Sequence, residues 1–163
     1  MDFLFRMNRY LTRVLIWIAG LLLLLMILLT CANIFLRLVW TPIKGTFELM
    51  GFFGAVVTAF ALGYTQMEKG HIAIDIVINQ FPRPVQRALE TVNHLVCMVF
   101  FGIAGWQLTK WGTNLMKTGE VTETLRIIFY PFTYGVALGC YGLALVMLVQ
   151  ALEVLARKQE PAL

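Results

Sequence analysis

The chain has 163 residues, of which 60% are hydrophobic and only 13% are charged, and its formal net charge is +4. Soluble domains carry about 25% charged residues, so this composition excludes an ordinary water-soluble fold and favours a membrane protein. The basic residues form no dense cluster, which argues against a nucleic-acid-binding protein.

Four long apolar runs without a charged residue predict the fold. Each contains 19 or more residues, and they cover residues 14–36, 49–67, 91–109 and 127–152. A helix of 19 residues spans about 28 Å, close to the hydrocarbon thickness of about 30 Å. A membrane β-barrel would instead need alternating segments of about ten residues. The sequence therefore predicts a single all-α domain over residues 1–163, with four transmembrane helices near 14–39, 46–67, 84–111 and 127–153.

The distribution of basic residues predicts how these helices are oriented. Eight lysines and arginines lie in the N-terminal segment, the loop between the second and third helices, and the C-terminal tail, against five in the other two loops. Positive residues are enriched in cytoplasmic loops. We therefore expect both termini and the central loop to be cytoplasmic.

Residues 1–13 are predicted to form an amphipathic segment at the membrane surface. Its apolar side chains can contact lipid while three arginines reach anionic headgroups, namely Arg6, Arg9 and Arg13. The same arginines are compatible with a secretory signal peptide, whose apolar region is about 7–15 residues long. The run that follows here is longer, so a transmembrane helix is favoured.

The first predicted hairpin carries polar residues close to a membrane edge. Asn33 and Arg37 share a face near the end of the first helix, and Glu48 lies two positions after the start of the second. A carboxylate in a membrane span can be a proton or cation site. Near a helix start, however, Glu48 can reach headgroups, stabilise the positive helix end, or pair with Lys44 or Arg37. A structural or subunit-interface role is therefore favoured over transport.

Small residues recur on two of the predicted helices. They occupy every fourth position of the second helix and form a G-x-x-x-G pair on the fourth, giving the candidates Gly51, Ala55, Ala59, Gly63, Gly135 and Gly139. Such residues let another helix approach closely in a membrane. We therefore predict helix-packing faces, and the pattern leaves open whether the partner helix belongs to the same chain.

The segment between the second and third helices is predicted to lie along the membrane surface. Residues 72–78 are apolar except for Asp75, and their periodicity distinguishes neither helix nor strand. Pro84 suits the first turn of the next helix. Arg83 and Arg87 lie opposite its apolar positions, so we expect both to anchor an amphipathic entry at the surface.

The sequence shows little of the chemistry that catalysis or a cofactor requires. His71 lies beside charged loop residues and His94 lies one turn after Glu90, so the two are poorly placed as axial ligands of a haem. The cysteines lie in three different apolar runs and form no C-x-x-C pair: Cys31, Cys97 and Cys140. We predict no enzymatic activity, no metal and no cofactor.

The centres of all four predicted helices lack ionisable residues, which autonomous transporters usually place there. An accessory subunit of a larger membrane complex is therefore the favoured class of protein. One alternative is a self-contained homodimeric exporter with Glu48 as its proton site. Another is an anchor subunit like a b-type cytochrome, for which the two histidines are unsuited.

Several motifs resemble the small membrane subunit of tripartite ATP-independent periplasmic (TRAP) transporters, the DctQ-like proteins. The resemblance covers nearly the whole chain. It rests on N-x-F-x-R at the end of the first helix, Pro42 before Glu48, the loop K-G-H-I-A-I-D with a later proline, and Thr124-Leu125 followed by Tyr130-Pro131. Its polar motif residues are Asn33, Arg37, Glu48, His71 and Asp75. Many relatives have an acidic pair where this chain has Glu48 alone.

The resemblance implies a scaffold in a bacterial inner membrane. A larger subunit would bind substrate and sodium and move as an elevator, and a periplasmic binding protein would deliver an organic acid. The small subunit would enlarge the stationary part of the transporter and hold it in the lipid bilayer. Substrate choice would then reside in the partners.

Overall fold

The computed structural model of the chain describes residues 2–68 and 82–156. The predicted surface segment at 72–78, including Asp75, lies outside these residues, as does His71. The side chains of Arg83 and Arg87 are also outside the described part.

Four long helices make up nearly all of the described chain. They are α1 (Asp2–Val39), α2 (Thr46–Met67), α4 (Arg83–Thr118) and α5 (Tyr130–Ala156). Each contains a stretch that is long and apolar enough to cross a membrane. The described residues contain no strand beyond one isolated bridge between Val121 and Ile128. The prediction of an all-α protein with four membrane-spanning helices is confirmed.

The first helix begins much earlier than the sequence pattern indicated. Residues 2–13 belong to α1, which is one continuous helix of 38 residues. Asn8 and Thr12 are buried one turn apart, in line with the buried Leu15 and Ala19. This segment therefore packs against the other helices, while Arg6, Arg9 and Arg13 are exposed.

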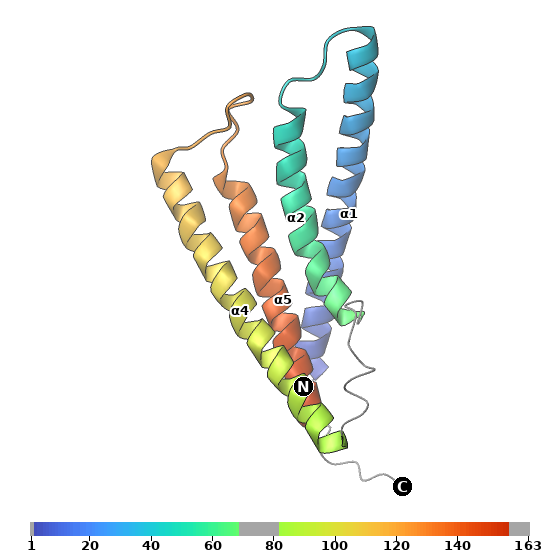
Figure 1. Cartoon of the computed structure of the whole chain (residues 1–163), viewed down its shortest axis with the longest axis vertical. Helices are drawn as coiled ribbons and strands as arrows, with labels where there is room; N and C mark the ends of the chain where they lie inside the picture. Colours follow the sequence, from blue (N-terminus) through green and yellow to red (C-terminus); the bar gives the residue numbers. More distant parts are fainter. Residues whose placement is uncertain (1, 69–81, 157–163) are drawn as a thin grey trace.

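The helices lie side by side in the order α1, α2, α5, α4 (Figure 1). α2 packs against α1 and α5, and α5 packs against α2 and α4. The helices converge where α1 begins and α5 ends, which we call the terminal end. They spread apart toward the loop end, formed by residues 40–45 and 119–129. The result is an open fan in which α1 and α4 each keep a long uncovered side.

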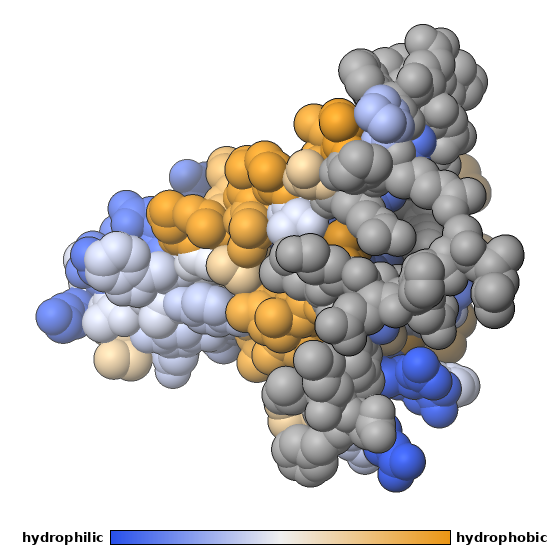
Figure 2. Space-filling model, turned by 90° about the horizontal axis from the view of Figure 1, so that it is seen from below, coloured by the Kyte–Doolittle hydropathy of each residue, from blue (hydrophilic) through white to orange (hydrophobic). Residues whose placement is uncertain are grey.

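The buried core is small, and most large apolar side chains lie on the outside. Leu143 and Val146 of α5 are the largest fully buried side chains, whereas Leu24 of α1 and Phe100 of α4 are 53% and 65% exposed. Viewed from the terminal end, apolar residues occupy the middle of the visible surface (Figure 2). Apolar surface on this scale is characteristic of helices that face lipid or another membrane polypeptide.

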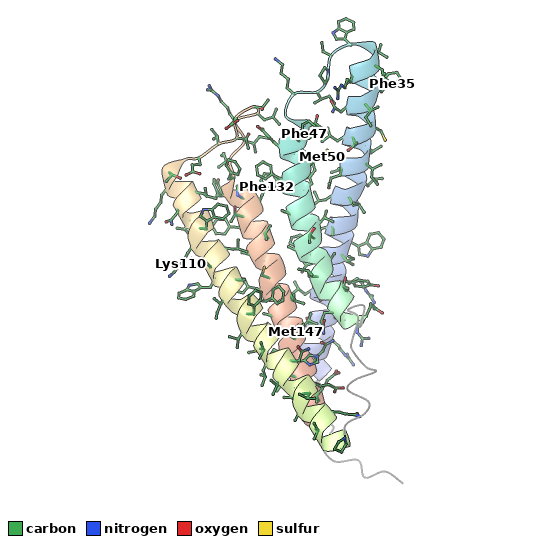
Figure 3. The ribbon with its side chains drawn as sticks, viewed as in Figure 1. Phe35, Phe47, Met50, Lys110, Phe132 and Met147 are labelled. Atoms are coloured by element: carbon green, nitrogen blue, oxygen red, sulfur yellow. The ribbon has the colours of Figure 1, made fainter. Side chains whose placement is uncertain are left out.

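α2 and α5 approach closely through small residues. A Cβ atom added to Gly139 would lie 2.7 Å from the backbone carbon of Ala59, so the two backbones leave no room for a side chain. Nearer the loop end, Phe132 of α5 points toward α2 and stacks on Phe52 with ring centroids 4.3 Å apart (Figure 3). Close backbone contact replaces the hydrophobic driving force that is missing in lipid.

α4 and α5 pack through two tyrosines placed over two glycines. Tyr134 lies over Gly112, and Tyr141 lies over Gly105, with ring atoms 3.3 Å and 3.0 Å from where a Cβ would stand. The two tyrosines are seven residues apart on α5, and the two glycines are seven residues apart on α4. Residues seven positions apart lie on the same face of a helix. The Tyr134 hydroxyl also lies 3.1 Å from the hydroxyl of Thr113. The sequence analysis did not identify this contact.

Candidate functional site

Asn33 holds the connection between α1 and α2. Its side-chain Oδ1 accepts a hydrogen bond from the backbone N–H of Ile43 at 2.8 Å. Thr46, the buried first residue of α2, donates its hydroxyl to the Ile43 carbonyl, also at 2.8 Å. Two side chains from different helices therefore fix both backbone groups of Ile43, which gives the short connection a defined shape.

Glu48 joins the two hairpins at the loop end. Its Oε1 accepts the backbone N–H of Thr124 at 2.8 Å, and its Oε2 accepts the N–H of Leu125 at 3.1 Å. These residues belong to the connection between α4 and α5 and lie 76 and 77 positions away in the chain. We call this contact the Glu48 clasp. Its partners are the Thr124-Leu125 pair that the sequence analysis singled out as a separate motif.

Gly45 lies beside the Glu48 clasp and leaves space for the side chain of Leu125. Gly45 precedes α2 with a φ of +76°, a left-handed conformation that favours glycine. The Leu125 side chain occupies the space in which a Cβ on Gly45 would stand. A larger residue at position 45 would therefore both strain the backbone and push the second connection away from α2.

The connection between α4 and α5 is itself well ordered by hydrogen bonds. The backbone N–H of Thr122 donates to the Ile127 carbonyl at 2.9 Å, and the Thr122 hydroxyl accepts the Ile127 N–H at 3.1 Å. Thr122 is buried, and Arg126 adopts a positive φ of 54° between the two. The Glu48 clasp thus binds a turn that has hydrogen bonds of its own.

The contacts of Glu48 can be compared with the roles that the sequence left open. Its carboxylate accepts hydrogen bonds from the backbone N–H groups of Thr124 and Leu125 and from the side chains of Thr122 and Thr124. Among the described residues, no hydrogen bond or ion pair joins it to Lys44 or Arg37. Arg37 is exposed at the end of α1. A carboxylate whose two oxygens each receive an N–H has the contacts expected of a structural clamp.

The six small-residue candidates divide into two groups. Ala59, Gly63 and Gly139 are buried inside the chain, and Gly135 lies half-buried against Val56. Gly51 and Ala55 are exposed, and a Cβ on Gly51 would meet nothing within 4 Å. A four-residue step turns the stripe by about 40° each time. It therefore faces α5 near the terminal end and turns outward near the loop end.

A second polar cluster links three helices near the terminal end. Gln150 of α5 accepts a hydrogen bond from the Gln66 side chain of α2 at 2.7 Å and donates to the Gln66 carbonyl at 3.1 Å. The same Gln150 oxygen lies 3.1 Å from Nε2 of His94 on α4, whose Nδ1 lies 2.6 Å from the Glu90 carbonyl. His94 therefore contributes to helix packing. The sequence analysis did not identify Gln66 or Gln150 as site residues. An amide side chain inside a long apolar run is the sequence feature that could have indicated them.

Within the described residues, no three His, Cys, Asp or Glu side chains are grouped as metal ligands. Cys31 is exposed, Cys97 is half-buried and Cys140 is buried, each on a different helix. The site is thus a set of hydrogen-bonded clamps at the two ends of the helices. Such an arrangement can hold helices and connections in place.

Fold and site together define a multi-pass helical membrane protein whose polar residues serve packing. A family model described as the DctQ component of tripartite ATP-independent periplasmic transporters matches residues 26–157, and so covers most of the chain. No curated protein matches the sequence. The chain belongs to the DctQ family and is a small permease subunit of a TRAP transporter. This family is a transporter component rather than an enzyme family.

Proposed function

We propose that this subunit is the stationary scaffold of its transporter in a bacterial inner membrane. It holds a large elevator-type subunit in the bilayer during sodium-coupled uptake of an organic acid, which a periplasmic binding protein delivers. Membership of the DctQ family supports the presence of both partners. The Glu48 clasp supports the scaffold role, because this carboxylate in the first turn of α2 is engaged in joining α2 to the connection between α4 and α5.

The proposed orientation follows from the basic residues. Both termini and residues 69–81 lie in the cytoplasm, so the loop end faces the periplasm. There, the binding protein would meet a surface whose two connections are held rigid by Asn33 and Glu48. A rigid surface favours docking because little conformational entropy is lost when the partner binds.

Reconstitution tests this function. Proteoliposomes would contain the large subunit with or without this chain, and the binding protein would carry a labelled C4-dicarboxylate or sialic acid. We expect sodium-driven uptake from the complete system, strongly reduced uptake without this chain, and none from this chain alone. Substrate movement by the chain alone along a proton gradient would instead establish the self-contained homodimeric exporter.

A further inference from the structure

The side of α4 that faces away from α5 carries a regular stripe of exposed residues. Its members lie at two positions of a seven-residue repeat, and all eight are exposed: Asn93, Phe100, Gln107 and Asn114 at one position, and Val96, Ile103, Lys110 and Lys117 at the other. We call them the α4 stripe. Lys110 points outward from α4, away from α5 (Figure 3). The repeat is the one by which two helices pack side by side at about 20°.

Three members of the α4 stripe are carboxamides within the apolar stretch Ala88–Thr118. This stretch of 31 residues is about 46 Å long, more than the hydrocarbon core of about 30 Å, so Asn93 and Asn114 lie toward its two ends and Gln107 lies deeper. Gln107 lies eleven residues before the end of α4 at Thr118, which is about 16 Å along the axis. Among the hydrogen bonds of the described residues, none involves the side chain of Gln107 or Asn114. The Asn93 oxygen receives only the Cys97 thiol, at 3.9 Å. Amide groups facing hydrocarbon are unfavourable, and hydrogen bonds to a neighbouring helix satisfy them.

A shallow, open hollow on the surface of α4 follows the loop-end half of the α4 stripe. Its volume is about 560 Å³, and it is lined by Ala104, Gln107, Leu108, Lys110, Trp111 and Asn114. Apolar, amide and cationic groups therefore line one depression. The uncovered side of α1 differs, because its exposed residues from Trp17 to Leu28 are predominantly large and apolar, as lipid requires.

We propose that the α4 stripe binds a transmembrane helix of the large membrane subunit. This inference rests on the proposed function and assigns the interface to one helix. Two copies of this chain share one orientation in the membrane, so pairing through the stripe would place Lys110 beside Lys110 and Lys117 beside Lys117. Like charges at facing positions disfavour that pair. The partner helix instead brings hydrogen-bonding groups opposite the carboxamides and acidic or other acceptor groups opposite the lysines.

Site-directed photo-crosslinking tests the assignment. A benzophenone amino acid replaces Phe100 or Ile103 in the α4 stripe, or Leu24 or Leu28 on the uncovered side of α1. All four residues are apolar and more than half exposed, at 65%, 59%, 53% and 57%. We expect adducts with the large subunit from the two α4 positions and only background from the two α1 positions. Adducts from α1 alone, or α4 adducts only with lipid or with a second copy, would overturn the assignment.

Two lysines provide a matched test of the charges. Lys110→Glu reverses a charge in the α4 stripe, whereas Lys44→Glu reverses an exposed charge at the same end of the molecule, outside the stripe. We expect less large subunit to co-purify with the first variant than with the second, and equal yields would overturn the proposal. If the unmodified chain itself fails to co-purify with the large subunit, the proposed function fails as well. If it co-purifies while α4 gives no adduct, only the α4 assignment fails.

Discussion

At the scale of single residues, the polar side chains of this protein act mainly on backbone groups. Asn33 holds the first connection of the loop end, and Glu48 holds the second. The sequence placed Glu48 near a membrane edge and favoured a structural role. It did not identify the partners, because Thr124 and Leu125 lie 76 and 77 positions after Glu48 and meet it only when the two hairpins pack.

We predict that Glu48→Gln weakens the Glu48 clasp without abolishing transport. The amide has one acceptor oxygen, and its NH2 group would face a backbone N–H, so one of the two hydrogen bonds from backbone N–H groups is lost. The melting temperature of the purified chain should fall, while uptake by the reconstituted complex persists. Glu123→Gln, at an exposed position of the same connection, is the control and should leave melting unchanged. Abolished uptake with unaltered melting would assign Glu48 to ion coupling.

The Gln150 cluster gives a second prediction at this scale. Gln150→Leu keeps α5 apolar and helical. It leaves the side-chain amide of Gln66 and Nε2 of His94 without the Gln150 oxygen that they contact. Losing partners for half-buried polar groups costs about 1–3 kcal/mol. Denaturant unfolding in mild detergent should therefore show a loss of this order. Gln107→Leu removes an exposed amide that makes no described hydrogen bond, and an equal loss from that variant would contradict the interpretation.

At the scale of elements, the contact between α2 and α5 depends on where each small residue points. The four-residue spacing on α2 indicated one continuous face. In the structure, the face rotates along the helix, so Ala59 and Gly63 pack inside the chain while Gly51 and Ala55 remain exposed. Spacing alone could not locate this division, because it depends on how α2 is rotated about its axis relative to α5.

Leucine substitutions distinguish the small residues that pack inside the chain from those that are exposed. Gly139→Leu must push α5 away from α2, because even its Cβ would lie 2.7 Å from the Ala59 backbone. Gly51→Leu meets open space. We expect Gly139→Leu to reduce the amount of monodisperse protein in size-exclusion chromatography several-fold, and Gly51→Leu to leave it unchanged. Comparable profiles would show that the α2–α5 contact is not tight in the membrane protein.

At the scale of the whole molecule, the open fan explains why this subunit suits an accessory role. The helices follow one another in the order α1, α2, α5, α4, and α1 also touches α5 through Leu15, which lies against Gly142. α1 and α4 do not meet closely, and each leaves one side uncovered. A row of four helices presents more lateral surface than a closed bundle of the same helices. That surface can contact lipid on one side and a larger membrane polypeptide on the other.

Thiol labelling tests the proposed orientation of the fan. With the three native cysteines replaced by serine, single cysteines are introduced at Glu123 of the loop end or at Arg9 near the terminal end, both exposed. A membrane-impermeant maleimide added to intact spheroplasts should label position 123 and spare position 9 until the membrane is broken. The reverse pattern would place the termini in the periplasm and contradict the positive-inside prediction.

The sequence by itself determined the number and type of the long helices. A helix in hydrocarbon must be long and apolar, and its backbone groups must form hydrogen bonds within the helix. These properties depend on the local sequence of each segment. Only the tertiary structure decided the order α1, α2, α5, α4, the continuation of α1 through residues 2–13, the Glu48 clasp, and the tyrosines placed over Gly105 and Gly112. These features depend on rotation and contact between helices far apart in sequence, which local hydropathy and spacing do not encode.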